Sequence, residues 1–143
     1  MGSRVERMGT GGSGVRSGLL TATRAVLGTG LAGMLLLMLR SGEPGRPDWW
    51  LGALAFCAWA ALPFGSVALA AGWMSACRPA AWVHLVAAVL LSAFGIWMLL
   101  AAFVWSPDPQ GAVVLIFLPI YQLVGYLPFL LLATWLQRRQ LDD

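Results

Sequence analysis

The sequence predicts an all-α, polytopic membrane protein, an up-and-down bundle of four transmembrane helices. Three observations predict this fold class. The chain of 143 residues is 59% hydrophobic and only 10% charged, which is far more apolar than a water-soluble domain of this size. Its apolar residues fall into four long runs. The breaks between the runs are short and rich in Pro, Gly, Ser and Asp, which are turn-forming residues.

The four runs are each long enough to form a helix that crosses a hydrocarbon core of about 30 Å. The predicted spans are about 19–39, 49–73, 80–105 and 111–136. The segments "RSGEPGRPD", "SACRP" and "SPDPQ" separate them, and such short connections require neighbouring helices to run antiparallel. We expect residues 1–18 to form a flexible N-terminal tail and residues 137–143 a C-terminal tail.

The first predicted span carries a stripe of small residues. Thr21, Ala25, Thr29 and Gly33 recur at every fourth position, so they share one face of a helix. Small residues on such a face let two helices approach closely. We expect the stripe to pack within the bundle, with a homodimer or another membrane protein as the alternative contact. Arg24 also falls in this span, and its side chain should extend to the nearer membrane surface.

The second and third predicted spans each carry one tryptophan well inside the membrane, Trp59 and Trp97. Pro63 removes a backbone donor from the second span and is expected to kink it. His84, the only histidine, lies near the inner end of the third span. We expect it to pack among polar neighbours at the membrane interface.

The fourth predicted span combines polar side chains with two prolines. Pro119 and Pro128 each leave a carbonyl without its helical donor and are expected to bend the helix. A helical wheel separates an aliphatic face from a polar and small face. The second face should point into the bundle, because an unpaired amide or phenol in hydrocarbon costs several kcal/mol. Its members are Pro119, Gln122, Tyr126, Phe129 and Ala133, flanked by Tyr121 and Gly125.

Five polar or aromatic side chains are expected to meet near the middle of the bilayer. Gln122, Trp59 and Trp97 each lie roughly 12 to 16 Å from the outer face when the helical rise is counted from the span ends. The predicted cluster comprises Trp59, Trp97, Tyr121, Gln122 and Tyr126. It either joins the helices by hydrogen bonds or lines a small cavity for a ligand or permeating molecule.

The arginines predict the orientation. All nine basic residues are arginine, and only Arg40 and Arg46 fall on the side opposite to the termini. The cytoplasmic side of a membrane protein carries the excess of positive charge, so both termini are expected in the cytoplasm. The arginines are scattered at span ends and form no stripe for nucleic acid. The lysine-free composition is typical of a GC-rich bacterial genome and indicates the inner (plasma) membrane.

The sequence argues against several function classes. No carboxylate lies within a predicted span, although ion-coupled carriers usually need one. The single histidine excludes a bis-histidine haem within one chain, and neither a zinc ligand set nor a catalytic triad is present. We therefore expect no enzyme activity, no cofactor and no metal.

The leading hypothesis is a non-enzymatic accessory or scaffold subunit in the lipid bilayer, bound to a membrane-protein partner or assembled as a homo-oligomer. One alternative is a small homodimeric transporter or channel for a neutral or hydrophobic solute. The other is a quinone- or lipid-binding membrane subunit.

Overall fold

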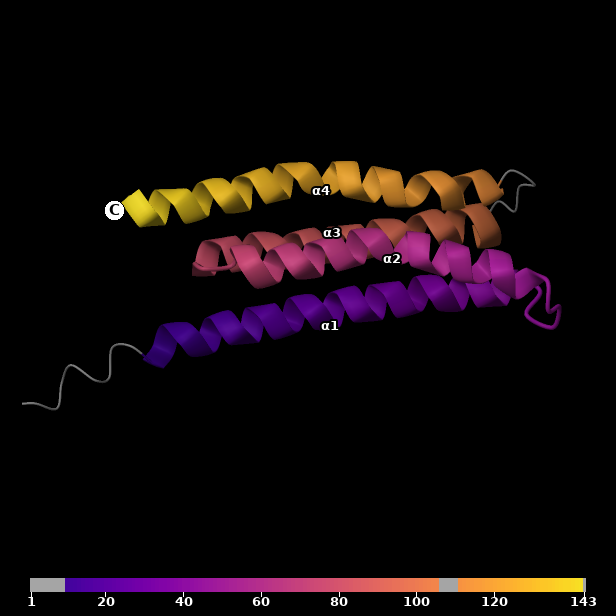
Figure 1. The fold of residues 1–143 in the computed structure, drawn as a ribbon, viewed down its shortest axis with the longest axis horizontal. Helices are drawn as coiled ribbons and strands as arrows, with labels where there is room; N and C mark the ends of the chain where they lie inside the picture. Colours follow the sequence, from indigo (N-terminus) through magenta and orange to yellow (C-terminus); the bar gives the residue numbers. More distant parts are fainter. Residues whose placement is uncertain (1–9, 106–110, 143) are drawn as a thin grey trace, which may run out of the picture.

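The computed structural model of the chain consists of long helices. It describes the backbone of residues 10–105 and 111–142, and the side chains of residues 14–105 and 113–140. The helices are α1 (Thr10–Ser41), α2 (Trp49–Met74), α3 (Arg78–Leu100), the π-helical turn η1 (Ala101–Trp105) that continues α3, and α4 (Gly111–Asp142) (Figure 1). Four of these segments are long and apolar enough to cross a membrane. They confirm the predicted all-helical chain with four helices of membrane-spanning length.

Both terminal helices extend beyond the predicted spans. α1 begins at Thr10, so residues 10–18 of the expected N-terminal tail are helical, while residues 1–9 lie outside the described part of the chain. α4 continues to Asp142 through most of the expected C-terminal tail. The predicted limits follow the apolar runs. A helix that has already formed gains one backbone hydrogen bond for each residue added, so it can continue into the polar residues beyond the run.

The α3 helix contacts each of the other three helices. α1 and α4 lie on opposite sides of the α2 and α3 helices (Figure 1). The interior face of α3 is rich in small residues, which allow close helix approach. The main core cluster consists of Leu27, Met34, Phe64, Val67, Ala87, Ala88, Leu91, Leu99, Leu118 and Tyr126.

Two close helix contacts depend on glycine. Gly30 of α1 lies directly against the Ser92 side chain of α3. Gly95 of α3 faces α1 and α4, and a β-carbon there would lie 2.6 Å from Nε2 of Gln122 and 2.8 Å from the sulfur of Met34. The absence of a side chain at these positions therefore sets how closely α3 packs against α1 and α4.

The three prolines predicted to bend helices lie inside helices that remain continuous. Pro63 falls within α2, and Pro119 and Pro128 fall within α4. Figure 1 shows α4 as one gently curved helix. Pro63 and Pro119 are buried, whereas Pro128 is exposed. The interior therefore includes two helix positions that lack a backbone donor.

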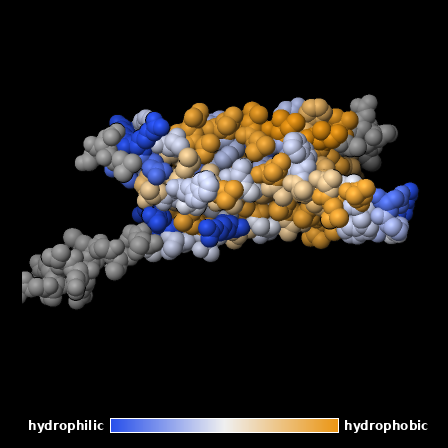
Figure 2. Space-filling model, in the orientation of Figure 1, coloured by the Kyte–Doolittle hydropathy of each residue, from blue (hydrophilic) through white to orange (hydrophobic). Residues whose placement is uncertain are grey.

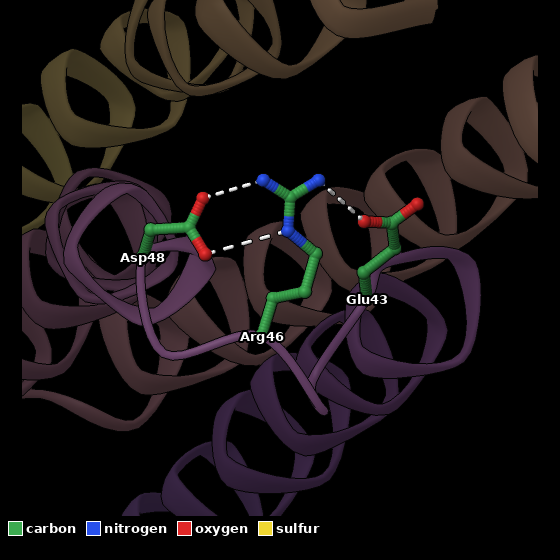
Figure 3. Close-up of polar contacts among 3 residues, drawn as sticks. All are labelled: Glu43, Arg46 and Asp48. Carbon is green, nitrogen blue, oxygen red and sulfur yellow. Dashed lines mark hydrogen bonds and ion pairs between the residues drawn. The ribbon is translucent and has the colours of Figure 1, made fainter.

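The turn between α1 and α2 is held by ion pairs (Figure 3). Nη2 of Arg46 lies 2.6 Å from Oδ2 of Asp48, and Nη1 lies 3.2 Å from Oε2 of Glu43. The hydrogen bond from Arg46 lowers the pKa of the Asp48 carboxyl below its ordinary value. The indole of Trp50 also donates to the carbonyl of Pro44 at 3.0 Å, so the turn and the start of α2 are tied together.

The surface is apolar over the middle of the bundle. Figure 2 shows hydrophilic surface at both ends and also over the N-terminal half of α1. Large apolar side chains cover the middle of the other helices, with Leu62 of α2 at 50% exposure and Leu127 of α4 at 51%. Such a distribution matches an apolar bilayer core between two aqueous faces.

Candidate functional site

A pair of buried polar side chains connects α3 to α4. The hydroxyl of Tyr126 lies 2.9 Å from Nδ1 of His84. Tyr126 is 4% exposed and His84 is fully buried. Nε2 of His84 is also buried and has no hydrogen-bond partner in the described part of the chain. The Tyr126 hydroxyl is thus the one polar group that the described residues offer to this imidazole.

Gln122 lies one helical turn before Tyr126 on α4 and also reaches α3. Its Nε2 donates to the carbonyl of Leu91 at 3.0 Å, while its buried Oε1 has no partner among the described residues. The missing side chain at Gly95 makes room for the amide, and Met34 of α1 lies against the same point. The Gln122 amide is therefore enclosed where three helices meet.

The five residues of the predicted cluster do not converge. Gln122 and Tyr126 lie in the interior, whereas Trp97 is 53% exposed and Tyr121 is 59% exposed. The indole of Trp59 donates instead to the carbonyl of Ile116 at 3.0 Å, so it joins α2 to α4 elsewhere. We attribute the difference to helix geometry, because equal depth does not place residues on the same face.

The helical rotation explains the two outward side chains. Successive residues of an α-helix are rotated by about 100°. Tyr121 is therefore rotated away from the inward Gln122 that follows it. Trp97 lies two residues after the inward Gly95, a rotation of about 200°. The depth of Trp97 along its helix therefore does not report the face on which its side chain lies.

The face predicted for α4 agrees with the observed burial. Pro119, Gln122, Tyr126 and Ala133 are buried, and Phe129 is half-buried. These positions recur at helical spacing and pack towards α2 and α3. The aliphatic face predicted for lipid is exposed at Ile116, Ile120 and Leu127 and half-buried at Leu123, Leu130 and Thr134.

His84 was expected among polar neighbours at the membrane interface, but it is fully buried and its described polar partner is the Tyr126 hydroxyl. His84 shares its helix face with Ala80, Ala88 and Gly95, all of them buried. That small-residue spacing was the available signal for an inward position. The number of residues from the predicted span ends at 80 and 136 instead predicts that Tyr126 lies deeper in the membrane than His84. In the structure the C-terminal part of α4 extends past the N-terminal end of α3 (Figure 1), and the side chains of Tyr126 and His84 lie at the same level.

The small-residue stripe of α1 faces outward along most of its length. Thr21, Ala25 and Thr29 are exposed, and only Gly33 is half-buried, beside Ile96 of α3. The buried positions of α1 lie on the opposite face, which packs against α3. They are Leu19, Thr23, Leu27, Gly30 and Met34. Gly30 on this second face lies directly against the Ser92 side chain, so α1 and α3 can approach closely there.

The outward face of α1 lacks the bulky side chains that cover the other helices. Among the α1 residues with described side chains, the exposed large hydrophobic ones are Val15, Leu36 and Leu39, near the two ends. The stripe occupies the length between them. The hydroxyl of Thr21 donates to the carbonyl of Ser17 at 3.0 Å, so it is satisfied within the helix. This face therefore offers a shallow surface along which another helix could pack closely.

The described residues include no group of three or more His, Cys, Asp or Glu side chains placed to hold a metal ion. Comparison of the chain with protein-family models, with curated proteins and with solved structures finds no match. The class of the protein thus follows from its own features. Four long apolar helices indicate a multi-pass membrane protein.

Proposed function

We propose that this protein is a non-enzymatic accessory or scaffold subunit of a larger membrane complex, and that α1 is the helix that contacts the partner. The observation that carries the proposal is the outward position of Thr21, Ala25 and Thr29. Mobile lipid chains make few lasting van der Waals contacts with a shallow surface. A second helix can pack closely against it and make many such contacts.

The partner contact is expected to depend on shape rather than on charge. Hydrophobic burial does not drive helices together within lipid, so close contact between small residues has to supply the attraction. Ala25 is exposed, and so is Ala32, which lies two helical turns further along the same face. A partner helix could therefore approach the α1 backbone.

The proposal includes an up-and-down topology with both termini in the cytoplasm, in the inner membrane of a bacterium. The N-terminal end of α1, the turn between α2 and α3 and the C-terminal end of α4 lie at one end of the bundle in Figure 1. Arg16 donates to the carbonyl of Ala76 in that turn at 3.3 Å. Arg78, Arg138 and Arg139 belong to the same end, which supports its placement on the positively charged, cytoplasmic side.

The transporter alternative has less structural support. It requires several polar side chains around a shared cavity, but Trp97 and Tyr121 point outward. Met34 and Gly95 enclose the Gln122 amide. These observations favour a role for the interior polar groups in joining helices, so we do not advance transport as a second function.

Bulky substitutions on the stripe test the proposal. Ala25→Leu combined with Thr29→Leu adds side-chain volume to an exposed face, so the bundle should fold while the partner contact is lost. Gly125→Leu is the matched control, because its β-carbon also meets nothing within 4 Å but lies on α4. The readout is the native mass of the protein extracted in mild detergent, with the co-purifying subunits identified.

The proposal predicts that the wild type and Gly125→Leu travel in one defined complex and that the double variant runs alone. A wild-type protein that runs as a monomer in every mild detergent would contradict it. Equal retention of the complex by both variants would contradict the assignment to α1.

A further inference from the structure

A groove runs between α1 and α2 on the outside of the bundle, and it is separate from the stripe of Thr21, Ala25 and Thr29. Its volume is about 230 Å³. The residues that shape it are Arg24, Leu27, Gly28 and Leu31 from α1 and Phe64 and Gly65 from α2. Apart from Arg24, all of these side chains are apolar or absent.

Two glycines leave the groove open. A β-carbon built at Gly28 or at Gly65 would meet no atom within 4 Å. Leu27 and Phe64 are buried beneath them, at 4% exposure each. The floor is therefore apolar and close-packed, while the walls lack the side chains that would fill the space. A flexible hydrocarbon chain could occupy such a groove without any rearrangement of the bundle.

Arg24 provides a positive charge at the same groove. A terminal nitrogen of its guanidinium lies 4.0 Å from the β-carbon position of Gly72, so the side chain reaches across to α2. Gly72 is close to the end of α2 at Met74, so this contact lies near one surface of the bundle. Within the described residues, Arg24 makes no hydrogen bond and no ion pair.

The carboxylates with described side chains are not available to Arg24. Glu43 and Asp48 are both paired with Arg46, in the turn that follows the C-terminal end of α1. A guanidinium at the edge of hydrocarbon is costly unless an anion accompanies it. Phosphate fits that need well, because the planar fork of arginine can bind two of its oxygens at once.

We propose that this groove binds an anionic phospholipid from the adjoining leaflet, with its phosphate on Arg24 and one acyl chain along Gly28 and Gly65. The charge and the apolar groove lie in the order that a phospholipid requires, with the charge nearer the membrane surface. Basic pockets between transmembrane helices on the cytoplasmic side recognise anionic head groups in this way. The proposal does not depend on the partner contact of α1.

The test uses the purified full-length protein, stripped of lipid in mild detergent. Phosphatidylglycerol and phosphatidylcholine with identical acyl chains are titrated separately, and bound lipid is counted by native mass spectrometry. The wild type should bind phosphatidylglycerol in preference. Arg24→Gln should weaken that binding by roughly tenfold or more, as expected for the loss of a charge-assisted contact. Arg40→Gln removes an exposed arginine near the other end of α1 and should retain the preference.

A second variant pair tests the acyl-chain groove. Gly65→Leu should fill the groove and reduce binding of phosphatidylglycerol, whereas Gly125→Leu should not. Both glycines have open space around the β-carbon position, so both variants should keep the thermal unfolding temperature of the wild type.

Three results would overturn the proposal. Equal binding of the two lipids by the wild type is the first. The second is an equal loss of phosphatidylglycerol binding in Arg24→Gln and Arg40→Gln, which would show that the lipid preference comes from general surface charge. The third is a Gly65→Leu protein that loses a protein partner or a dimer but binds lipid as before. That result would show that the groove binds a helix of another subunit.

Discussion

The hydroxyl of Tyr126 lies 2.9 Å from Nδ1 of His84, and this contact joins α4 to α3 in the interior of the bundle. The two residues are 42 positions apart in the chain. Because Nε2 of His84 has no partner in the described structure, removal of the tyrosine hydroxyl leaves both ring nitrogens without one. Buried polar groups left in that state destabilise a fold.

We predict that Tyr126→Phe lowers the free energy of unfolding by about 1 to 2 kcal/mol, within the range of interhelical hydrogen bonds in membranes and of unpaired buried groups. Tyr121→Phe is the matched control on the same helix, because Tyr121 is 59% exposed. Reversible unfolding in mixed micelles measures both values. Equal effects of the two substitutions would show that the buried hydroxyl contributes nothing specific.

Gln122→Leu is predicted to change the free energy of unfolding by less than about 1 kcal/mol. The substitution removes the hydrogen bond to the Leu91 carbonyl, but it also removes the buried Oε1 that has no partner among the described residues. These two effects oppose each other. The same unfolding measurement provides the value.

Flux of neutral solutes into vesicles tests the competing function of Gln122. We predict no difference in flux between wild-type and Gln122→Leu vesicles. A flux that the wild type supports and the folded variant abolishes would instead favour the transporter.

Gly95→Ala is predicted to destabilise the bundle by about 1 to 3 kcal/mol, the usual range for an overpacked core. Its added β-carbon would lie 2.6 Å from Nε2 of Gln122 and 2.8 Å from the sulfur of Met34. Gly125→Ala should be tolerated, because nothing lies within 4 Å of its β-carbon position. Thermal unfolding in detergent compares the two variants. A Gly95→Ala protein as stable as Gly125→Ala would show that α3 is not held closely there.

The Asp48 carboxyl is predicted to titrate below its ordinary pKa, because Arg46 stabilises the charged form. The ion pair therefore contributes at all pH values above the ordinary pKa of aspartate, about 4, and is lost as the pH falls through the lowered value. An NMR titration of the carboxyl carbon measures the midpoint. Arg46→Gln should raise that midpoint towards the ordinary value, and identical midpoints in both proteins would contradict the assigned cause.

The membrane-spanning helices could be predicted because their signals are strong and local. An apolar run of about 20 residues bounded by turn-forming residues has few other solutions. The inward face of α4 was also predictable, since Gln122 and Tyr126 are one turn apart and cannot both be left in lipid. Helix ends were less predictable, because Thr10 and Asp142 lie in polar segments whose helical state the apolar pattern does not report.

The contacts between helices could not be predicted from the same signals. Counting residues gives the depth of Trp97 and Tyr121 but not the side of the bundle on which they lie. His84 meets Tyr126 because α4 is displaced along α3, and no local pattern encodes that displacement. The stripe of Thr21, Ala25 and Thr29 has the same composition whether it packs within the bundle or outside it. Which face of α1 is buried depends on how well the competing face, which includes Leu27, Gly30 and Met34, packs against α3.

Photo-crosslinking in intact membranes tests the central claim most directly. A photoreactive amino acid is placed at position 25, on the outward face of α1, and in a second protein at position 125, on the outward face of α4. We predict a discrete protein adduct of defined mass from position 25 and none from position 125. Adducts from position 125 alone, or lipid adducts alone from both positions, would contradict the role of α1 as the helix that contacts the partner.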